Sequence, residues 1–287
     1  MATLRFSVSE FSTPNHSYEE DLAAFAAGGA GGIGIAEAKL PHGEDEESVR
    51  KLRESGLKAT ICLPTTLAIL PIGMTPEPED PHARVELLAA SIRRLAAFDP
   101  EVVLVLTGVP GERDVAEARA LAVDGLRRLG QAARDAGVRI ALEPIHRSAS
   151  AEFSLVDDLP GAEALLAETG DDSIGIIFDT WHLWDTPDVL GQARRLAHRF
   201  PAVHVNDWRD PTRHWDDRAL PGEGVMDLSA MLGALEAGGF DGWYDMEIFS
   251  GEQYPDSLLK LSPEELVRRG LDGFTRAWEA RTAATGN

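Results

Sequence analysis

Val102-Val103-Leu104-Val105-Leu106 and Ile174-Gly175-Ile176-Ile177-Phe178 are two nearly continuous apolar runs in a chain of 287 residues. Runs of this length without polar alternation are typical of parallel strands that are covered on both faces. Further β-rich runs occur on either side of them, and helical patterns separate one run from the next. The eight predicted strand regions are Leu4–Phe11, Gly32–Ala38, Leu57–Pro64, Val102–Gly108, Arg139–Ile145, Ser173–Trp181, Pro201–Asp207 and Gly242–Phe249.

The segments between the runs carry helix signals. Ser17-Tyr18-Glu19-Glu20 has the spacing of a capping box, and Gly28-Gly29 ends the helix that it begins. The other predicted helices are Glu46–Glu54, Pro81–Phe98, Val115–Ala136, Pro160–Glu168, Val189–Arg199, Leu228–Ala237 and Pro263–Arg281. Eight β–α units in a chain of this length predict an α/β fold, a closed (β/α)₈ TIM barrel, with a doubly wound open sheet as the alternative. We expect a single domain over residues 1–287, because no linker or composition change divides the chain.

Charge and cysteine content narrow the function. The formal net charge is −21, so contact with nucleic acid or an anionic membrane would be repulsive. A single cysteine, Cys62, excludes an internal disulfide and a zinc site built from several thiolates. The first residues have no secretory pattern and no apolar run has the length of a membrane span, so we expect a cytoplasmic protein. A homo-oligomer is compatible with the sequence.

Two connections are longer than a barrel turn requires. Pro64–Pro81 follows the third strand region and is rich in proline and apolar residues. Trp208–Asp227 follows the seventh and carries Arg, His, Trp and Gly. Barrel active sites lie at the carboxyl ends of the strands, so both segments are candidate walls of a pocket.

Four polar residues end the last four strand regions: Glu143, Asp179, His204 and Glu247. Successive strands of a barrel end at one rim, so we expect these side chains to converge. Three buried carboxylates need a cation to neutralise them. The donor set predicts one divalent metal ion, with Mn²⁺, Mg²⁺ or Co²⁺ favoured and Zn²⁺ also compatible.

These residues also carry a family resemblance. The arrangement E…D-x-x-H…H-x-x-D…E, formed by Glu143, Asp179-Thr-Trp-His182, His204-Val-Asn-Asp207 and Glu247, resembles the xylose-isomerase-like TIM-barrel superfamily of sugar isomerases and epimerases. The segment from Asp217-Arg218 through Pro-Gly-Glu-Gly to Asp227, and Glu247-Ile-Phe followed by Tyr254, are most similar to inosose isomerase-like members.

The resemblance implies that Glu143, Asp179, His204 and Glu247 hold the metal. It also implies that Glu143 and Glu247 are the catalytic acid/base pair on opposite faces of the substrate, and that His182 and Arg218 bind substrate oxygens. A metal that chelates the carbonyl and adjacent hydroxyl oxygens would stabilise the enediolate left when the α-proton departs. The expected partner is a small sugar or polyol.

The chain departs from the family at strand two. Many members have a Gly-Val/Ile-Glu-Leu pattern there, whereas this chain has Gly32-Ile33-Gly34-Ile35, and Glu37 is the candidate to replace the missing carboxylate in part. His146 and Trp181 are further candidate substrate contacts, and Asp207 is a candidate support for the metal ligands. Tryptophans near these strand ends would form an apolar wall against a sugar ring, although core packing is the default for each one alone: Trp181, Trp184, Trp208 and Trp215.

We predict a divalent-metal-dependent isomerase or epimerase of an unphosphorylated ketose, inosose or related polyol. A metal-dependent dehydratase or lyase on a keto-sugar, inosose or dehydroshikimate-like substrate would use the same enediolate, and the sequence barely separates the two. An abasic-site endonuclease would need more histidines and a basic groove, which the net charge of −21 disfavours. A barrel that binds a sugar without turnover is the remaining alternative.

Overall fold

The computed structural model describes residues 4–281, and their parallel strands form two hydrogen-bonded sets. One set has the order β3-β2-β1-β12-β9-β8 and the other the order β4-β5-β6-β7. The strands are β1 (Phe6–Ser9), β2 (Gly32–Gly34), β3 (Lys58–Ala59), β4 (Ile61–Cys62), β5 (Val102–Val105), β6 (Ile140–Leu142), β7 (Gly175–Ile176), β8 (Phe178–Asp179), β9 (Ala202–Val205) and β12 (Trp243–Met246).

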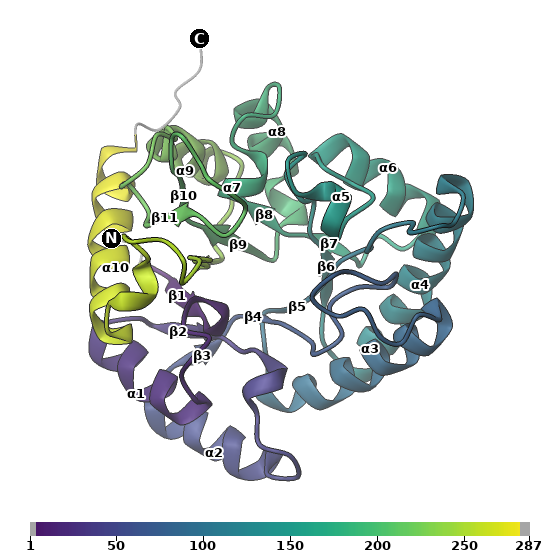
Figure 1. The fold of residues 1–287 in the computed structure, drawn as a ribbon, viewed down its shortest axis with the longest axis horizontal. Helices are drawn as coiled ribbons and strands as arrows, with labels where there is room; N and C mark the ends of the chain where they lie inside the picture. The colour runs from purple at the N-terminus through teal and green to yellow at the C-terminus, as the bar shows by residue number, and fades with distance from the viewer. Residues whose placement is uncertain (1–3, 282–287) are drawn as a thin grey trace.

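The two sets join into one closed barrel. Strands β3 and β4 are successive parts of one extended segment, in which the Thr60 N–H donates to the Ile33 carbonyl at 2.9 Å. The Thr60 carbonyl accepts from the Val102 N–H at 3.2 Å, so this segment pairs on both sides. Strands β7 and β8 meet in the same way at Ile177, whose N–H donates to the Leu142 carbonyl at 2.9 Å. The predicted barrel is therefore confirmed over the described residues (Figure 1).

Helices surround the barrel at every predicted position (Figure 1). The Ser17 capping box is present, and Gly29 ends the first helix at φ 93°, in the left-handed region that glycine favours. The last helix packs against the first, which closes the outer ring. The ring helices are α1 (Tyr18–Gly28), α2 (Asp45–Ser55), α3 (Pro81–Leu95), α4 (Val115–Ala136), α6 (Leu159–Thr169), α8 (Val189–Leu196), α9 (Leu228–Ala237) and α10 (Pro263–Ala280).

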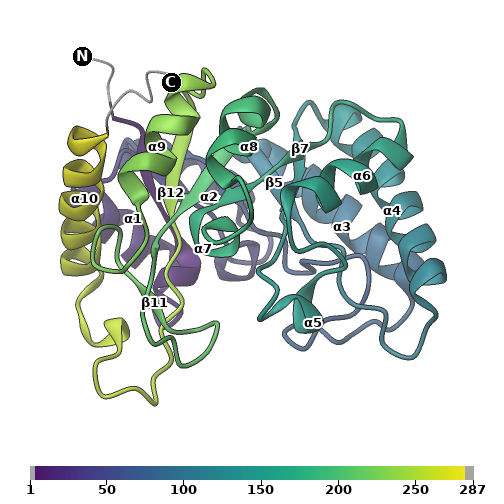
Figure 2. The ribbon, with the colours of Figure 1, turned by 90° about the horizontal axis from the view of Figure 1, so that it is seen from above.

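Short elements that the sequence did not predict add to this frame. The antiparallel pair β10–β11 and the helical turn α5 lie at the same end of the barrel (Figure 2). The short elements are η1 (Glu10–Ser12), η2 (Glu37–Lys39), η3 (Ala96–Phe98), α5 (Ser150–Phe153), α7 (Thr180–Leu183), η4 (Ala197–Arg199), β10 (Asp207–Trp208), β11 (Arg218–Ala219) and η5 (Leu258–Lys260).

The two long connections are held by buried polar residues. Arg84, on α3, donates through Nε to the Ala68 carbonyl and through Nη1 to the Thr75 carbonyl, both at 2.8 Å. Asp207 accepts hydrogen bonds from the backbone N–H groups of Gly222 and Met226, both at 3.0 Å. A Cβ at Gly224 would lie 2.4 Å from Asp207 Oδ1, so this tight turn requires glycine. Both connections are thereby anchored to the barrel.

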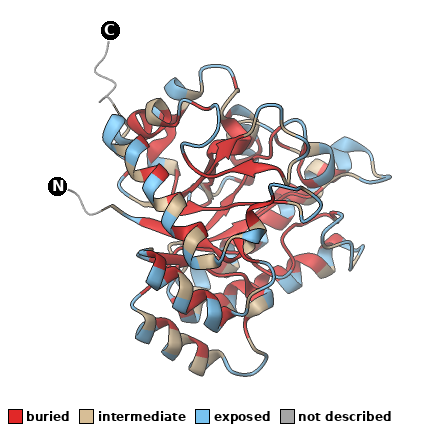
Figure 3. Ribbon diagram, turned by 60° about the vertical axis from the view of Figure 1, so that its left-hand side comes forward, coloured by how far each residue is buried: buried red, intermediate tan, exposed pale blue. Residues whose placement is uncertain are grey.

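Burial follows the expected layers. The strands are buried, whereas the ring helices expose their outer faces (Figure 3). Every residue of β5 is buried, as the continuous apolar run around Val103 predicts. Within residues 4–281, no helix combines the length and the apolarity needed to cross a lipid bilayer.

The glycine at the end of strand two makes room for an acidic side chain inside the barrel. A Cβ at Gly34 would lie 2.4 Å from Oδ2 of Asp245, a fully buried residue of β12. The other carboxylate oxygen, Oδ1, accepts a hydrogen bond from the Thr60 hydroxyl at 3.2 Å. The space beside Gly34, where the resemblance leads one to expect a glutamate on strand two, is therefore filled by the Asp245 carboxylate of β12. Glu37 does not replace it, because its carboxylate is engaged by the Thr65 N–H at 2.9 Å and by Arg94 at 3.5 Å.

We therefore expect Gly34→Ala to reduce the free energy of unfolding by about 1–3 kcal/mol, as overpacking of a filled interior does. Urea denaturation of the purified variant measures the change. Gly73→Ala is the matched control, because a Cβ at Gly73 has nothing within 4 Å. Adding Asp245→Ala should restore part of the loss. Equal free energies of unfolding for Gly34→Ala and Gly73→Ala would contradict the close packing described for Gly34.

Candidate active site

The structure brings the four predicted strand-end residues together. Glu143 follows β6, Asp179 ends β8, His204 lies in β9 and Glu247 follows β12. Neighbouring strands are in register, with Asp179 opposite His204. All four side chains are buried. Parallel strands that end at one rim bring these groups together although the chain separates them widely.

The His204 ring is central to the cluster. Its Nδ1 lies 2.7 Å from Glu143 Oε1 and 3.8 Å from both Asp179 Oδ2 and Glu247 Oε2. The opposite ring nitrogen, Nε2, lies 3.7 Å from Asp245 Oδ2. His204 Nε2 and Asp245 Oδ2 are buried, and neither has a hydrogen-bond partner in the described part of the chain. One edge of the imidazole thus faces the predicted ligand set and the other faces the barrel interior.

The two oxygens of Asp179 have different surroundings. Oδ1 accepts hydrogen bonds from the Trp181 N–H at 2.6 Å and from the Asn206 side-chain amide at 3.2 Å. Oδ2 faces His204, His182 and Arg218. Burial opposes ionisation of Asp179, but His182, Arg218 and His204 outweigh it and hold its pKa below the usual range. One oxygen is therefore fixed by the start of α7, and the other faces the cluster.

Arg218 supplies a positive charge between two of the carboxylates. Its Nη1 lies 3.2 Å from both Asp179 Oδ2 and Glu247 Oε2. The guanidinium carbon lies 4.7 Å from the centre of the Phe249 ring and 5.2 Å from that of Trp181. Trp181 is fully buried and supports Arg218 from behind.

His182 is held in one orientation by the backbone. The His146 N–H donates to its Nδ1 at 3.1 Å, so a neutral His182 carries its proton on Nε2. Burial lowers the pKa of His182 to about 3, although Asp179 opposes this, and the ring is therefore neutral. Nε2 lies 3.3 Å from Arg218 Nη2 and 3.7 Å from Asp179 Oδ2, on the side of the cluster.

The charges of the cluster depend on one another. Burial disfavours a charge on His204, but Glu247, Glu143 and Asp179 outweigh it and raise its pKa to about 10. Burial raises the pKa of Glu143 to about 7, against the opposing effect of His204. In the absence of a metal ion, a proton on His204 and the Arg218 guanidinium therefore offset most of the carboxylate charge.

Two overlapping triads of side chains in this cluster could hold a divalent cation. One ligand atom from each of Asp179, His204 and Glu247 lies within 4.8 Å of the others, and the same holds for Glu143, Asp179 and His182. Three carboxylates and Arg218 leave two negative charges when His204 is neutral, which a divalent ion would balance. Oxygen donors with one imidazole nitrogen suit Mn²⁺, Mg²⁺ or Co²⁺, and Zn²⁺ accepts the same groups.

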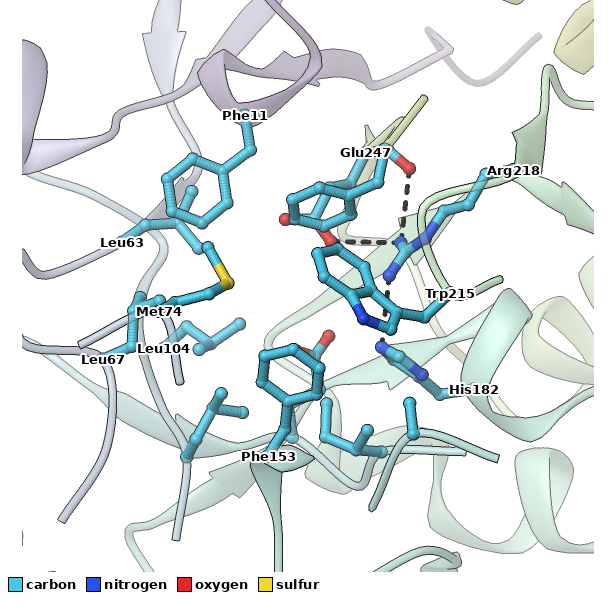
Figure 4. Close-up of a pocket in the computed structure, with 15 residues that line it drawn as sticks. Phe11, Leu63, Leu67, Met74, Leu104, Phe153, His182, Trp215, Arg218 and Glu247 are labelled. Carbon is cyan, nitrogen blue, oxygen red and sulfur yellow. Dashed lines mark hydrogen bonds and ion pairs between the residues drawn. The ribbon is translucent and has the colours of Figure 1, made fainter. Parts of the chain in front are cut away.

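A cavity opens beside the cluster, and its empty space, part of which is open solvent, is about 490 Å³. Glu143, His182, Arg218 and Glu247 are its polar lining residues, and the last three lie on one side of it (Figure 4). The opposite side contains the apolar side chains of Phe11, Leu63, Leu67, Met74 and Leu104 (Figure 4). The long connection after the third strand region supplies Leu67 and Met74, as the sequence predicted for a pocket wall.

Other predicted site residues lie outside the cavity wall. His146 is turned toward other partners, because its Nε2 lies 3.1 Å from Asp185 Oδ1 and its Nδ1 lies 2.7 Å from Ser148 Oγ. Its ring packs against the rings of Trp181 and Trp208. Neither His146 nor Trp181 lines the cavity, and both lie behind His182. Asp207 binds backbone N–H groups of the connection after β9, so its place is in anchoring that segment.

Two residues near the ligands were not identified from the sequence. Asn206 positions Asp179 through its side-chain amide and also donates to the Glu247 carbonyl at 3.3 Å. Asp245 lies beside His204 Nε2, and burial raises its pKa to about 7. Asp245 is two residues before Glu247, and strand alternation places such a pair on the same face. That spacing is the signal by which it could have been found.

Comparisons with known proteins agree with this geometry. The family model described as xylose isomerase-like TIM barrel matches residues 22–278. An inosose isomerase of Bacillus licheniformis is 28% identical over 156 residues, covering 53% of each chain. An inosose dehydratase of Geobacillus thermodenitrificans is 26% identical over 142 residues, covering 44% of this chain and 46% of its own. An L-ribulose 3-epimerase of Mesorhizobium japonicum is 29% identical over 136 residues, covering 47% of this chain and 42% of its own. The chain spans about half the length of the curated relatives it matches.

Solved structures show the same fold over nearly the whole chain. A Sinorhizobium meliloti protein has a TM-score of 0.83 at 24% identity and covers 95% of this chain and 98% of its own. An IOLI protein solved with a bound zinc atom has a TM-score of 0.79 at 20% identity, and the match covers 98% of this chain and 100% of its own. With its eight β–α units and a family match over residues 22–278, the chain belongs to the xylose isomerase-like TIM barrel family.

Proposed function

We propose that this protein is a divalent-metal-dependent isomerase or epimerase of an unphosphorylated ketose, inosose or related polyol. The observation that carries the proposal is the buried cluster of Glu143, Asp179, His204 and Glu247 at the edge of a cavity. Relatives that are inosose isomerases and an L-ribulose 3-epimerase support the same class of reaction.

Glu143, Asp179, His204 and Glu247 are the residues that would hold the ion. When bound, a divalent cation would supply Lewis-acid stabilisation for the negative charge that develops on the carbonyl oxygen of the substrate. Asn206 and the backbone of α7 keep Asp179 in place for this role.

Glu143 and Glu247 are the groups that would move the proton. Both line the cavity, and a carboxylate beside the α-carbon can accept its proton while the C–H electrons pass into the carbon–carbon bond of an enediolate. In the metal-free protein, burial raises the pKa of Glu143 to about 7, against the opposing effect of His204. Return of the proton to the other carbon gives an isomer, and return to the other face gives an epimer.

His182 and Arg218 are placed to bind the oxygens of the substrate. His182 and Arg218 both line the cavity, and a neutral His182 carries its proton on Nε2. Such donors stabilise negative charge on oxygen in a site that excludes water. The two residues would therefore orient the hydroxycarbonyl unit between Glu143 and Glu247.

A dehydratase would begin with the same proton abstraction and then expel a β-hydroxyl group. The relative from Geobacillus thermodenitrificans, an inosose dehydratase, favours this as a second candidate. Metal-loaded protein incubated with inososes and ketoses in deuterium oxide separates the two. Deuterium at an α-carbon of an isomeric or epimeric product supports the proposal, whereas a new ultraviolet-absorbing enone identifies a dehydratase. No exchange with any compound of the panel would contradict both.

Replacing Glu247 by Gln should keep the fold and reduce the rate of deuterium exchange by about 10²- to 10⁴-fold, the usual contribution of a positioned acid/base group. The variant should also bind the metal more weakly, because one ligand charge is removed. Nuclear magnetic resonance measures the exchange, and metal analysis after dialysis measures retention. The matched control is Glu252→Gln, an exposed residue in the segment after β12. Full exchange activity in Glu247→Gln would remove this residue from the mechanism.

Metal binding should depend strongly on pH. Because the pKa of His204 is raised to about 10 in the metal-free protein, an ion must displace its proton to use Nδ1 as a ligand. The apparent affinity should therefore rise with pH, by about tenfold per unit between about pH 7 and about pH 9. Below about pH 7 the dependence should become steeper, since burial also raises the pKa of Glu143 to about 7.

Titration calorimetry with Mn²⁺ in buffers of different ionisation enthalpy counts the protons released. His204→Gln should lose about one of them and bind the ion more weakly. His198→Gln, at an exposed histidine, should match the original protein. Affinity that does not change with pH would show that the ion does not compete for the His204 proton.

A further inference from the structure

The cavity beside the acidic cluster is polar on one side only. Of its fifteen lining residues, Glu143, His182, Arg218 and Glu247 are polar, and the other eleven are apolar or aromatic. The four polar residues are those assigned above to the reacting carbons and their oxygens. The walls beyond them therefore determine which substituents the rest of the substrate can carry.

A row of aromatic rings crosses the cavity from its apolar side to the Arg218 guanidinium, which lies 4.7 Å from the ring centre of Phe249. Phe11 and Phe249 have ring centres 5.8 Å apart, Phe249 and Trp215 are 5.4 Å apart, and Trp215 and Phe153 are 5.2 Å apart. The last two pairs meet edge to face, an arrangement that aromatic rings favour. The row runs from η1, which contains Phe11, to α5, which contains Phe153, and all four rings line the cavity.

Aliphatic side chains complete the wall. Leu63, Leu104, Leu106 and Ile145 come from β4, β5, β6 and the residues that follow these strands. Met74 lies at the lip, and 46% of its surface is exposed, which is unusual for a large apolar side chain (Figure 4). Rings and aliphatic groups together line the part of the cavity that the four polar residues leave, and the rings reach the polar cluster at Arg218.

This surface is poorly suited to the outer hydroxyl groups of a free sugar. A buried hydroxyl without a partner costs about 1–3 kcal/mol, and a ketohexose would place several of them against these side chains. Within the described part of the chain, the apolar side offers one side-chain donor, the buried indole N–H of Trp215, which has no acceptor. It could bind a single oxygen, such as an ether or one hydroxyl.

We propose that the substrate is a hydroxyketone that carries an aryl substituent. Its hydroxycarbonyl unit lies at Glu143 and Glu247, and the aryl ring packs against the row of Phe11, Phe249, Trp215 and Phe153. This inference rests on the proposed function for the position of the hydroxycarbonyl unit. It keeps the hydroxycarbonyl unit of the proposed function but differs from it in the rest of the substrate, which is a flat apolar group in place of the outer hydroxyl groups of a ketose or inosose.

Two small probes test the proposal on the metal-loaded protein. Phenacyl alcohol and hydroxyacetone share the same hydroxyketone and differ only in a phenyl in place of a methyl group. We expect phenacyl alcohol to bind at least about tenfold more tightly, since burial of a phenyl group contributes that much. Titration calorimetry measures both dissociation constants, with D-fructose as the free ketose. Equal or tighter binding of hydroxyacetone or D-fructose would overturn the proposal.

Deuterium exchange at the hydroxymethyl carbon of each probe separates this inference from the proposed function. Each enzymatic rate is divided by the uncatalysed rate of that probe, because the phenyl group itself acidifies the carbon. Tight binding of phenacyl alcohol without exchange of either probe would contradict the proposed function and support the aryl site. Exchange of D-fructose at a kcat/KM equal to or above that of phenacyl alcohol would support the function and overturn the aryl site.

Two pairs of variants locate the effect. Phe153→Ser should weaken the binding of phenacyl alcohol at least about fivefold and leave hydroxyacetone unchanged, whereas Phe240→Ser, at a similarly buried ring outside the cavity, should leave both unchanged. Met74→Ser should act in the same direction without risk to the fold, since its side chain is half exposed. Its control is Leu190→Ser, at 40% exposure on α8. If both Phe153→Ser and Met74→Ser still bind phenacyl alcohol more tightly than hydroxyacetone by the original ratio, the proposal is overturned.

Discussion

Three buried carboxylates share one small space with His204, and the site depends on how their charge is compensated. Burial alone would keep such groups protonated, because each charge loses its hydration. His204 Nδ1 faces all three carboxylates, and Arg218 bridges two of them. The metal-free protein compensates with a proton on the imidazole. A divalent cation could take over that role, and the cluster is thus poised to exchange a proton for an ion.

The surrounding polar residues restrict how these side chains can move. Asn206 and the start of α7 bind one oxygen of Asp179 and leave the other facing His204. The His146 N–H orients the His182 ring, and the rings of Trp181 and Phe249 contact the guanidinium of Arg218. Because these partners belong to strands or to segments anchored on them, they hold the cluster in place before a substrate binds. Such preorganisation is what electrostatic catalysis requires.

The cavity combines this charged side with an apolar wall, and the two sides have different tasks. In the proposed function the charged side acts on a hydroxycarbonyl unit, and the relatives of this chain include an inosose isomerase, an inosose dehydratase and an L-ribulose 3-epimerase. The apolar wall comes largely from connections and short elements that follow the strands, such as the lip at Met74 and the α5 ring of Phe153. In a barrel, the strands position the chemistry and the connections select the substrate. We infer that selectivity in this protein depends on its aromatic row.

The sequence by itself determined the barrel and the convergence of four polar side chains at one rim, for a definite physical reason. Strands buried on both faces are continuously apolar, so a polar residue at the end of one is conspicuous, and barrel topology places such ends at one rim. Glu143 and Asp179 were identified in this way. Only the tertiary structure decided which supporting residues face the site. His146 points to Asp185, Asp207 binds the next connection, and Asp245 fills the space beside Gly34. These outcomes depend on side-chain direction and on contacts between residues far apart in the chain, which no local pattern records.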